Sequence, residues 1–155
     1  MAKMYPYLAF ENAKEALGYY EEVFGATNIS RLPVSEEQSE MFGLAKENLE
    51  NTTVHGGFTV LGANLFCSDS FGKEVKPSNQ ISIMLDSNSE DPAAVADADA
   101  FFEKVSSSGR VKVTLPFEEQ FWGGKMGQFV DEYGISWMIH TQPYSKLIKN
   151  KWTRY

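Results

Sequence analysis

The chain has 155 residues, of which 43% are hydrophobic and 14% aromatic, and its formal net charge is −7. This length and apolar content suit one globular domain with a sizeable core, and they exclude a disordered chain. The acidic charge argues against a general nucleic-acid surface, which requires a basic patch. No apolar run approaches the roughly 20 residues that a membrane-spanning helix needs.

Two further features bear on the cellular compartment. The opening MAKMYPYLAF enters a predicted strand directly and lacks a cleavage site of small residues, so we expect no signal peptide. Cys67 is the single cysteine, and it has no second cysteine with which to form an internal disulfide. We therefore predict a cytoplasmic protein with neither a membrane nor a nucleic acid as its partner.

The first half of the chain, residues 3–70, predicts a strand, a helix and three further strands. Residues 4–10 alternate as a strand does, with Tyr5 and Tyr7 on one face. Asn12 is a predicted helix N-cap, and Gly25 closes that helix. The helical spacing predicts one buried stripe made of Ala13, Ala16, Leu17, Tyr20 and Phe24.

An acidic stretch at about residues 35–51 has no counterpart in the second half. We favour a surface excursion for this stretch, because it is polar and only weakly periodic. The alternative is a short helix that folds back as a lid and brings Met41, Phe42 and Leu44 with it.

The second half, residues 79–142, repeats the order of the first. A strand over residues 80–86 precedes Asp91 and Pro92, which are a predicted N-cap and first helical residue. Three strands follow at about residues 110–117, 127–131 and 135–141. The predicted buried stripe of the helix contains Val95, Ala98, Phe102 and Val105.

The segment 143–155 is a basic tail without acidic residues. We favour packing of its apolar side chains on the body or on a sister subunit, and a contact with RNA or an acidic partner is the alternative. The basic residues are Lys146, Lys149, Lys151 and Arg154, and the apolar ones are Leu147, Ile148 and Trp152.

Two βαβββ modules in one chain are a narrow architectural signal. They predict an α+β fold in a single domain, residues 1–155, in which curved mixed sheets surround a cleft. This order of elements resembles the vicinal-oxygen-chelate superfamily, which contains glyoxalase I, extradiol dioxygenases and the bleomycin and fosfomycin resistance proteins. The stretches PYLAFENAKEALGYYEEVFG, VHGGFTVLGANLFCSDS and FWGGKMGQFVDEYGISWMIH are similar to its PhnB-like branch.

Many members of that branch carry the label 3-demethylubiquinone-9 3-methyltransferase. Methyl transfer requires S-adenosylmethionine, which usually binds a glycine-rich strand–loop–helix in a doubly wound sheet. The pairs Gly56-Gly57 and Gly123-Gly124 lie beside predicted strands, where a turn or bulge explains them. The sequence therefore argues against the activity that this label names.

Enzymes of the superfamily hold a divalent metal through four residues, usually His or Glu, on the first and last strands of each half. The resemblance places Tyr5, Cys67, Gln80 and Met138 at these positions. None of the four is a histidine or a carboxylate, and a Cys with a Met suits copper(I) rather than iron, manganese or zinc. We therefore predict that the usual metal site is absent and that no cofactor is bound.

Two histidines leave a displaced metal site open as an alternative. His55 and His140 lie in predicted strands, and Asp69 or Glu11 could join them around an ion. We favour hydrogen-bonded strand histidines instead. Three further acids near the second hairpin, Glu118, Glu119 and Asp131, are interpreted as a solvated charge run.

The function that we predict is small-molecule binding in an aromatic cleft, by analogy with the bleomycin-resistance members and without an identified reaction. The alternatives are a metal-dependent lyase or dioxygenase of glyoxalase type, and a structural dimer whose tail docks a partner. The resemblance also implies a homodimer. The candidate ligand-binding residues are Tyr5, Tyr7, His55, Cys67, Gln80, Trp122, Met138 and His140.

Overall fold

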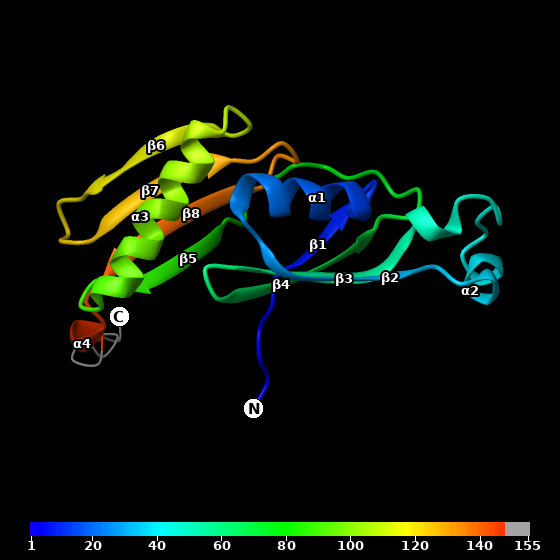
Figure 1. Cartoon of the computed structure of the whole chain (residues 1–155), viewed down its shortest axis with the longest axis horizontal. Helices are drawn as coiled ribbons and strands as arrows, with labels where there is room; N and C mark the ends of the chain where they lie inside the picture. The colour runs from blue at the N-terminus through cyan, green and yellow to red at the C-terminus, as the bar shows by residue number, and fades with distance from the viewer. Residues whose placement is uncertain (148–155) are drawn as a thin grey trace. The chain divides into compact units, whose positions relative to one another are not determined.

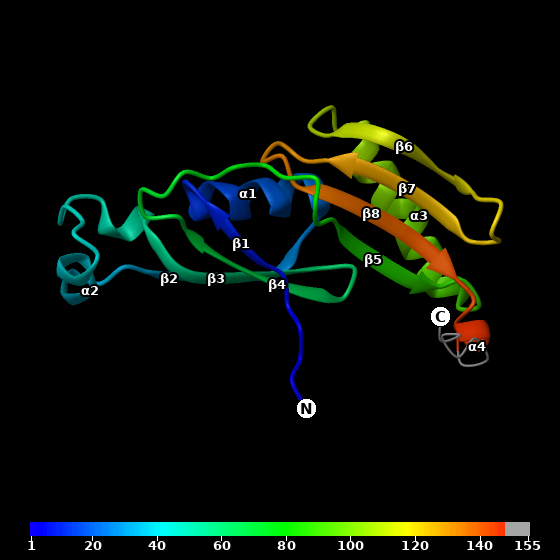
Figure 2. The same cartoon turned by 180° about the vertical axis from the view of Figure 1, so that it is seen from behind.

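The computed structural model describes residues 1–147. The chain divides into two compact units, Met1–Pro77 and Ser78–Tyr155. Each unit carries one four-stranded mixed sheet, and one long helix covers one face of that sheet (Figures 1 and 2). The predicted α+β architecture of two βαβββ modules is therefore confirmed.

The first sheet has the strand order β1-β4-β3-β2, with β1 parallel to β4 and the other neighbours antiparallel. Its helix, α1, begins after Asn12, whose side chain accepts a hydrogen bond from the Glu15 N–H at 3.1 Å. The elements are β1 (Tyr7–Phe10), α1 (Ala13–Phe24), β2 (Thr27–Pro33), α2 (Glu36–Met41), the 3₁₀ turn η1 (Leu49–Asn51), β3 (Thr53–Val60) and β4 (Ala63–Asp69).

The buried stripe of α1 is the one that the sequence predicts. All five predicted side chains are buried, and the ring of Tyr20 stacks on Phe58 of β3 at 4.7 Å. The helix ends at Gly25, whose φ of 66° lies in the left-handed region that favours glycine. Strand β1 is shorter than predicted, because it starts only after Pro6, which has no N–H to donate.

The acidic stretch after β2 forms the short helix α2, capped by a reciprocal pair of hydrogen bonds between Ser35 and Gln38. Met41 at its end is 82% exposed, so this side chain does not close over a site in its own unit. The ring of Phe42 stacks on Phe71 at 4.8 Å. The stretch therefore fits the favoured interpretation of a surface excursion, and it contains the six-residue helix α2.

The second sheet has the order β5-β8-β7-β6, with β5 parallel to β8. Its first strand starts at Ile83 and not at residue 80 as predicted, because Ser78 and Gln80 form a turn in which the Gln80 N–H donates to the Ser78 hydroxyl. The elements are β5 (Ile83–Asn88), α3 (Pro92–Ser107), β6 (Lys112–Glu119), β7 (Lys125–Val130), β8 (Ser136–Gln142) and α4 (Tyr144–Leu147).

Helix α3 begins after Asp91, whose carboxylate accepts a hydrogen bond from the Ala93 N–H at 3.0 Å. Its buried face consists of the predicted Ala98, Phe102 and Val105, joined by Phe101, while Val95 is half-buried. The helix lies in front of the second sheet in Figure 1 and behind it in Figure 2, so the sheet has one face without a helix. The predicted packing of Ile148 and Trp152 lies outside the described residues.

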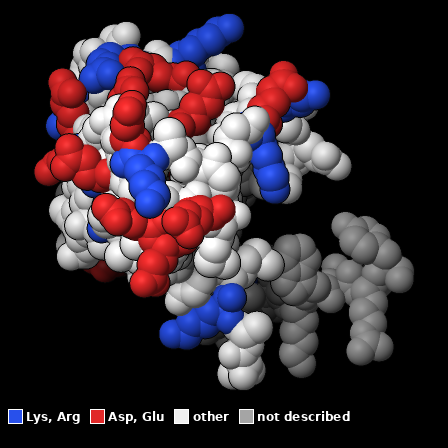
Figure 3. Space-filling view, turned by 90° about the vertical axis from the view of Figure 1, so that its right-hand side faces the viewer, with Lys and Arg blue, Asp and Glu red and all other residues white. Residues whose placement is uncertain are grey.

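Acidic side chains are prominent on the surface, as the net charge of −7 requires. Figure 3 shows one face on which Asp and Glu gather, with Lys and Arg between them. Within residues 1–147, no helix is both long enough and apolar enough to cross a membrane.

Candidate functional site

The face of the second sheet opposite α3 carries a connected group of polar side chains. Successive residues of a strand point to opposite faces, and Trp137 and Ile139 of β8 are fully buried. Met138, His140 and Gln142 therefore lie on the helix-free face. The parallel register pairs His140 with Asp86 of β5, which brings two residues far apart in sequence side by side.

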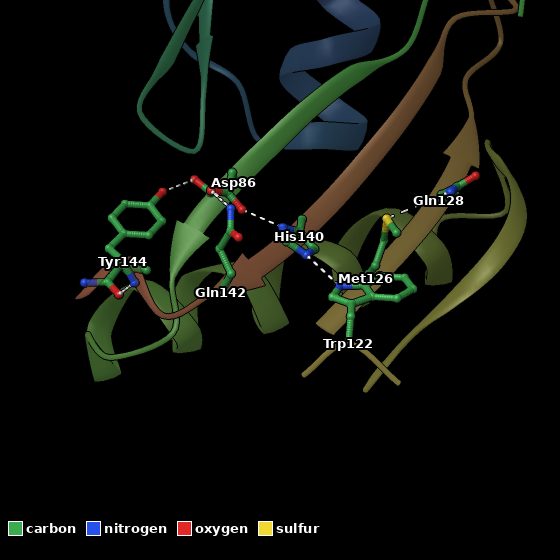
Figure 4. Close-up of polar contacts among 8 residues, drawn as sticks. Asp86, Trp122, Met126, Gln128, His140, Gln142 and Tyr144 are labelled. Carbon is green, nitrogen blue, oxygen red and sulfur yellow. Dashed lines mark hydrogen bonds and ion pairs between the residues drawn. The ribbon is translucent and has the colours of Figure 1, made fainter. Parts of the chain in front are cut away.

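His140 is the centre of this group (Figure 4). Its Nδ1 lies 2.7 Å from Oδ1 of Asp86, and its Nε2 lies 3.4 Å from Nε1 of Trp122. A carboxylate only accepts and an indole N–H only donates, so Nδ1 must carry the proton while Nε2 accepts. The contacts thus assign His140 as the neutral Nδ1–H tautomer. The residue is buried, with 7% of its surface exposed.

Asp86 is held from a second direction. Its Oδ2 accepts a hydrogen bond from the Gln142 side-chain amide at 2.9 Å, and its backbone carbonyl accepts one from the Tyr144 hydroxyl at 2.9 Å. Burial, followed by the charge and hydrogen bond of Asp86, raises the pKa of Tyr144 above its ordinary value, so its hydroxyl remains a donor. The amide contact fixes the carboxylate that orients His140, and the hydroxyl contact holds the backbone of Asp86.

Trp122 reaches His140 from the turn between β6 and β7. That turn is closed by a hydrogen bond from the Gln120 N–H to the Gly124 carbonyl at 2.8 Å. A Cβ at Gly124 would lie 2.7 Å from Nε2 of His140 and 2.8 Å from Nε1 of Trp122. Only glycine leaves room for the imidazole and the indole at this position.

Apolar side chains surround the polar group. Met126 pairs with His140 across β7 and β8, and its sulfur is 4.0 Å from the Gln128 side-chain nitrogen. Met84 pairs with Met138 and is 50% exposed, while Trp122 is 48% exposed. The helix-free face thus offers soft, polarizable surface around one imidazole and one carboxylate.

The first unit carries an aromatic group of its own, on the face of its sheet away from α1. The Tyr7 hydroxyl lies 3.2 Å from Nδ1 of His55, whose ring stacks on Phe66 at 5.2 Å. Tyr5 meets the edge of Phe66 at 5.2 Å. Tyr5 and Tyr7 are 42% and 55% exposed, so this group lies at the surface of its unit.

The eight residues predicted to bind a ligand therefore lie in separate parts of the structure. Tyr5, Tyr7 and His55 meet in the first unit, and Trp122 contacts His140 in the second, with Met138 two residues before His140 on the same face. Gln80 lies in the turn before β5. Cys67 is fully buried on the core side of β4, and burial raises the pKa of its thiol to about 11.

Two acids that the sequence offers as ligands have structural roles. Asp69 accepts a hydrogen bond from the Ala13 N–H at 2.8 Å and so caps α1. Asp131 is buried and accepts hydrogen bonds from the Tyr133 and Ile135 N–H groups and from the Trp137 indole. The interpretation of Asp131 as a solvated charge is therefore wrong.

Sequence reasoning identified His140 and Trp122 but missed Asp86, which contacts His140, and Gln142, which donates to Asp86. Alternation with the apolar Leu85 was the available signal for Asp86, which is the last residue of the predicted strand. Over residues 1–147, no three side chains among His, Cys, Asp and Glu come together as a group that could hold a metal ion.

Comparison with known proteins relates this chain to one protein family and to a relative in Escherichia coli. The family described as 3-demethylubiquinone-9 3-methyltransferase matches residues 2–140. Protein YjdN of Escherichia coli is 22% identical over 142 residues, which cover 87% of this chain and 92% of YjdN.

Solved structures agree with this assignment. Protein PA1353 of Pseudomonas aeruginosa is 26% identical with a TM-score of 0.63, over 92% of this chain and 99% of its own. The PhnB protein of Bacillus cereus is 23% identical with a TM-score of 0.59, and the match covers 91% of this chain and 100% of the PhnB chain. The fosfomycin resistance protein FosX of Listeria monocytogenes is 14% identical and shares the fold with a TM-score of 0.58. The match covers 94% of this chain and 97% of the FosX chain. The chain belongs to the family described as 3-demethylubiquinone-9 3-methyltransferase, the PhnB-like family of the glyoxalase and bleomycin-resistance superfamily.

Proposed function

We propose that this protein binds a small, flat organic molecule on the helix-free face of its second sheet, without a bound metal. One observation carries the proposal: half-exposed Trp122 and Met84 lie on the same face as the buried His140 and its half-buried partner Asp86. Sites for small molecules combine apolar and aromatic surface with a few fixed polar groups in this way. The apolar side chains supply contact area, and the pair supplies orientation.

The proposal includes no methyl transfer, although the family's description names one. Binding of S-adenosylmethionine usually relies on a glycine-rich loop between a strand and a helix of a parallel, doubly wound sheet. Both sheets of residues 1–147 are mixed, and Gly123 and Gly124 lie in a turn between antiparallel strands. The geometry therefore supports binding and suggests no group that methylates the ligand.

We further propose that the protein acts in the cytoplasm as a homodimer. The support for the dimer is the resemblance to the superfamily together with the exposed rings of Tyr5 and Tyr7, because exposed apolar surface often marks contact with a partner or a ligand. Sedimentation velocity at several protein concentrations tests it, and a monomer throughout would refute it.

Thermal shift with a library of flat aromatic and conjugated compounds tests the proposed function. A ligand at about 100 times its dissociation constant stabilises the native state by about 2.7 kcal/mol, which corresponds to a rise in Tm of several degrees. We expect hits of this size for the wild type and smaller shifts for His140→Asn. A library that leaves Tm unchanged would contradict the proposal.

Metal analysis of the same preparation is the companion measurement. We expect less than about one tenth of an equivalent of bound metal, and thermal-shift hits that persist in the presence of a chelator. A near-stoichiometric metal ion that the chelator removes along with ligand binding would instead favour the lyase or dioxygenase alternative.

A further inference from the structure

The contacts of His140 leave Nε2 as its acceptor atom, beside the half-exposed side chain of Trp122. Nδ1 is committed to Asp86 at 2.7 Å, a short distance for a charge-assisted hydrogen bond. Asp86 is itself fixed by the Gln142 amide at 2.9 Å, so the imidazole is held in one orientation. The lone pair on Nε2 therefore points in a defined direction, toward Trp122.

The hydrogen bond that occupies this lone pair is the longest among those of His140 and Asp86. The distance from Trp122 Nε1 to His140 Nε2 is 3.4 Å, whereas N–H donors ordinarily lie about 2.9–3.0 Å from their acceptors. The indole belongs to a turn rather than to a strand, it is 48% exposed, and its ring packs against Phe121, which is 97% exposed. Within residues 1–147, the contact with Nε2 is the one side-chain hydrogen bond that the indole makes.

We propose that Nε2 of His140 is a hydrogen-bond-accepting subsite for a flat ligand that carries a ring N–H or a hydroxyl, and that the Trp122 indole fills this subsite in the free chain. The inference rests on the proposed function and names the chemical class of its ligand. A donor that approaches Nε2 at an ordinary distance replaces a long hydrogen bond with a better one, while its flat body covers Met84 and Met126. Asp86 is the positioning residue, since it fixes the tautomer that leaves Nε2 free to accept.

The competing interpretation is that the indole contact only closes the β6–β7 turn. The two interpretations differ for a variant that lacks the indole. If Nε2 is a subsite, Trp122→Ala vacates it and an external donor binds there. If the contact is only structural, the vacated surface shows no preference for a donor over an ether or an N-methyl analogue.

The test uses free indole and 1-methylindole as probes, which differ in the ring N–H. Trp122→Ala is titrated with each probe, and the ring nitrogens of His140 are followed by long-range ¹H–¹⁵N NMR. We expect indole to bind about five- to tenfold more tightly than 1-methylindole, the worth of one hydrogen bond, and to shift the Nε2 signal. Wild-type protein should bind indole more weakly than Trp122→Ala, because its own indole competes.

Equal affinity for both probes, or no change in the Nε2 signal, would overturn the subsite. Trp122→Phe is the second variant, because it keeps a flat ring on the turn but removes the N–H. Without any probe its Nε2 signal should move relative to wild type while the Nδ1–H tautomer persists, and a signal identical to wild type would overturn the assigned contact. The library thermal shift answers separately whether wild-type protein binds small molecules at all.

Discussion

Replacing Gly124 with alanine is expected to displace the Trp122 indole from His140 and to weaken ligand binding by tenfold or more, because the added methyl group itself blocks access to Nε2. The added Cβ would lie 2.7 Å from Nε2 of His140, 2.8 Å from Nε1 of Trp122 and 3.2 Å from the Thr141 carbonyl. These atoms must separate, and overpacking of this kind typically costs about 1–3 kcal/mol of stability. The ¹⁵N-indole signal of Trp122 and the thermal shift of the best library compound measure the two effects.

Gly123→Ala is the matched control, one residue away in the same turn. Gly123 has a φ of 90°, so alanine strains the backbone there, but its Cβ would meet no atom within 4 Å. The control should lower Tm while His140 and Trp122 keep their contact. If Gly124→Ala binds ligand as well as Gly123→Ala does, the close approach at Gly124 has no role in binding.

Asp131→Ala is expected to lower the free energy of unfolding by about 3 kcal/mol, because one buried carboxylate satisfies three donors. Oδ1 accepts from the Tyr133 N–H at 2.9 Å and the Ile135 N–H at 3.0 Å, and Oδ2 accepts from the Trp137 indole at 2.9 Å. Alanine leaves these donors without their acceptor beside the buried Trp137 ring. Urea denaturation should show a lower midpoint with an unchanged m-value.

The neighbouring Glu132→Ala provides the comparison. Glu132 forms an ion pair with Arg110 at 2.9 Å, but its side chain is 44% exposed, and exposed pairs contribute roughly 0–1 kcal/mol. We expect a loss well below that of Asp131→Ala. Equal losses for the two variants would show that the carboxylate of Asp131 does not hold the β7–β8 turn together.

The two long helices, α1 and α3, were the most predictable elements of the fold. Each has a local start signal, Asn12 or Asp91, and an apolar stripe at helical spacing that meets one sheet. The start of β5 was less predictable, since Gln80 and Ile81 continue an alternation of polar and apolar residues that is typical of a strand. The Gln80 N–H instead donates to the Ser78 hydroxyl and forms a turn, so the strand begins only after these two residues.

His140 and Trp122 of the candidate site were predictable as individual residues, but the contacts that pair His140 with Asp86 and Asp86 with Gln142 were not. His140 was recognisable from its place in a strand pattern, while its contact with Asp86 depends on the parallel register of β5 and β8. That register joins residues 54 positions apart, and no local signal specifies it. Cys67 shows the same limit, because a shift of one residue along β4 decides whether its side chain faces the core or the helix-free side.

Chemical-shift mapping with the strongest thermal-shift compound tests the central claim most directly. We expect the backbone and side-chain signals that move to belong to the helix-free face of the second sheet, around Met84, Asp86, Trp122, Met126 and His140, while the buried face of α3 stays unchanged. Signals that move on α3, or on the first unit while His140 stays fixed, would contradict a ligand site on this face.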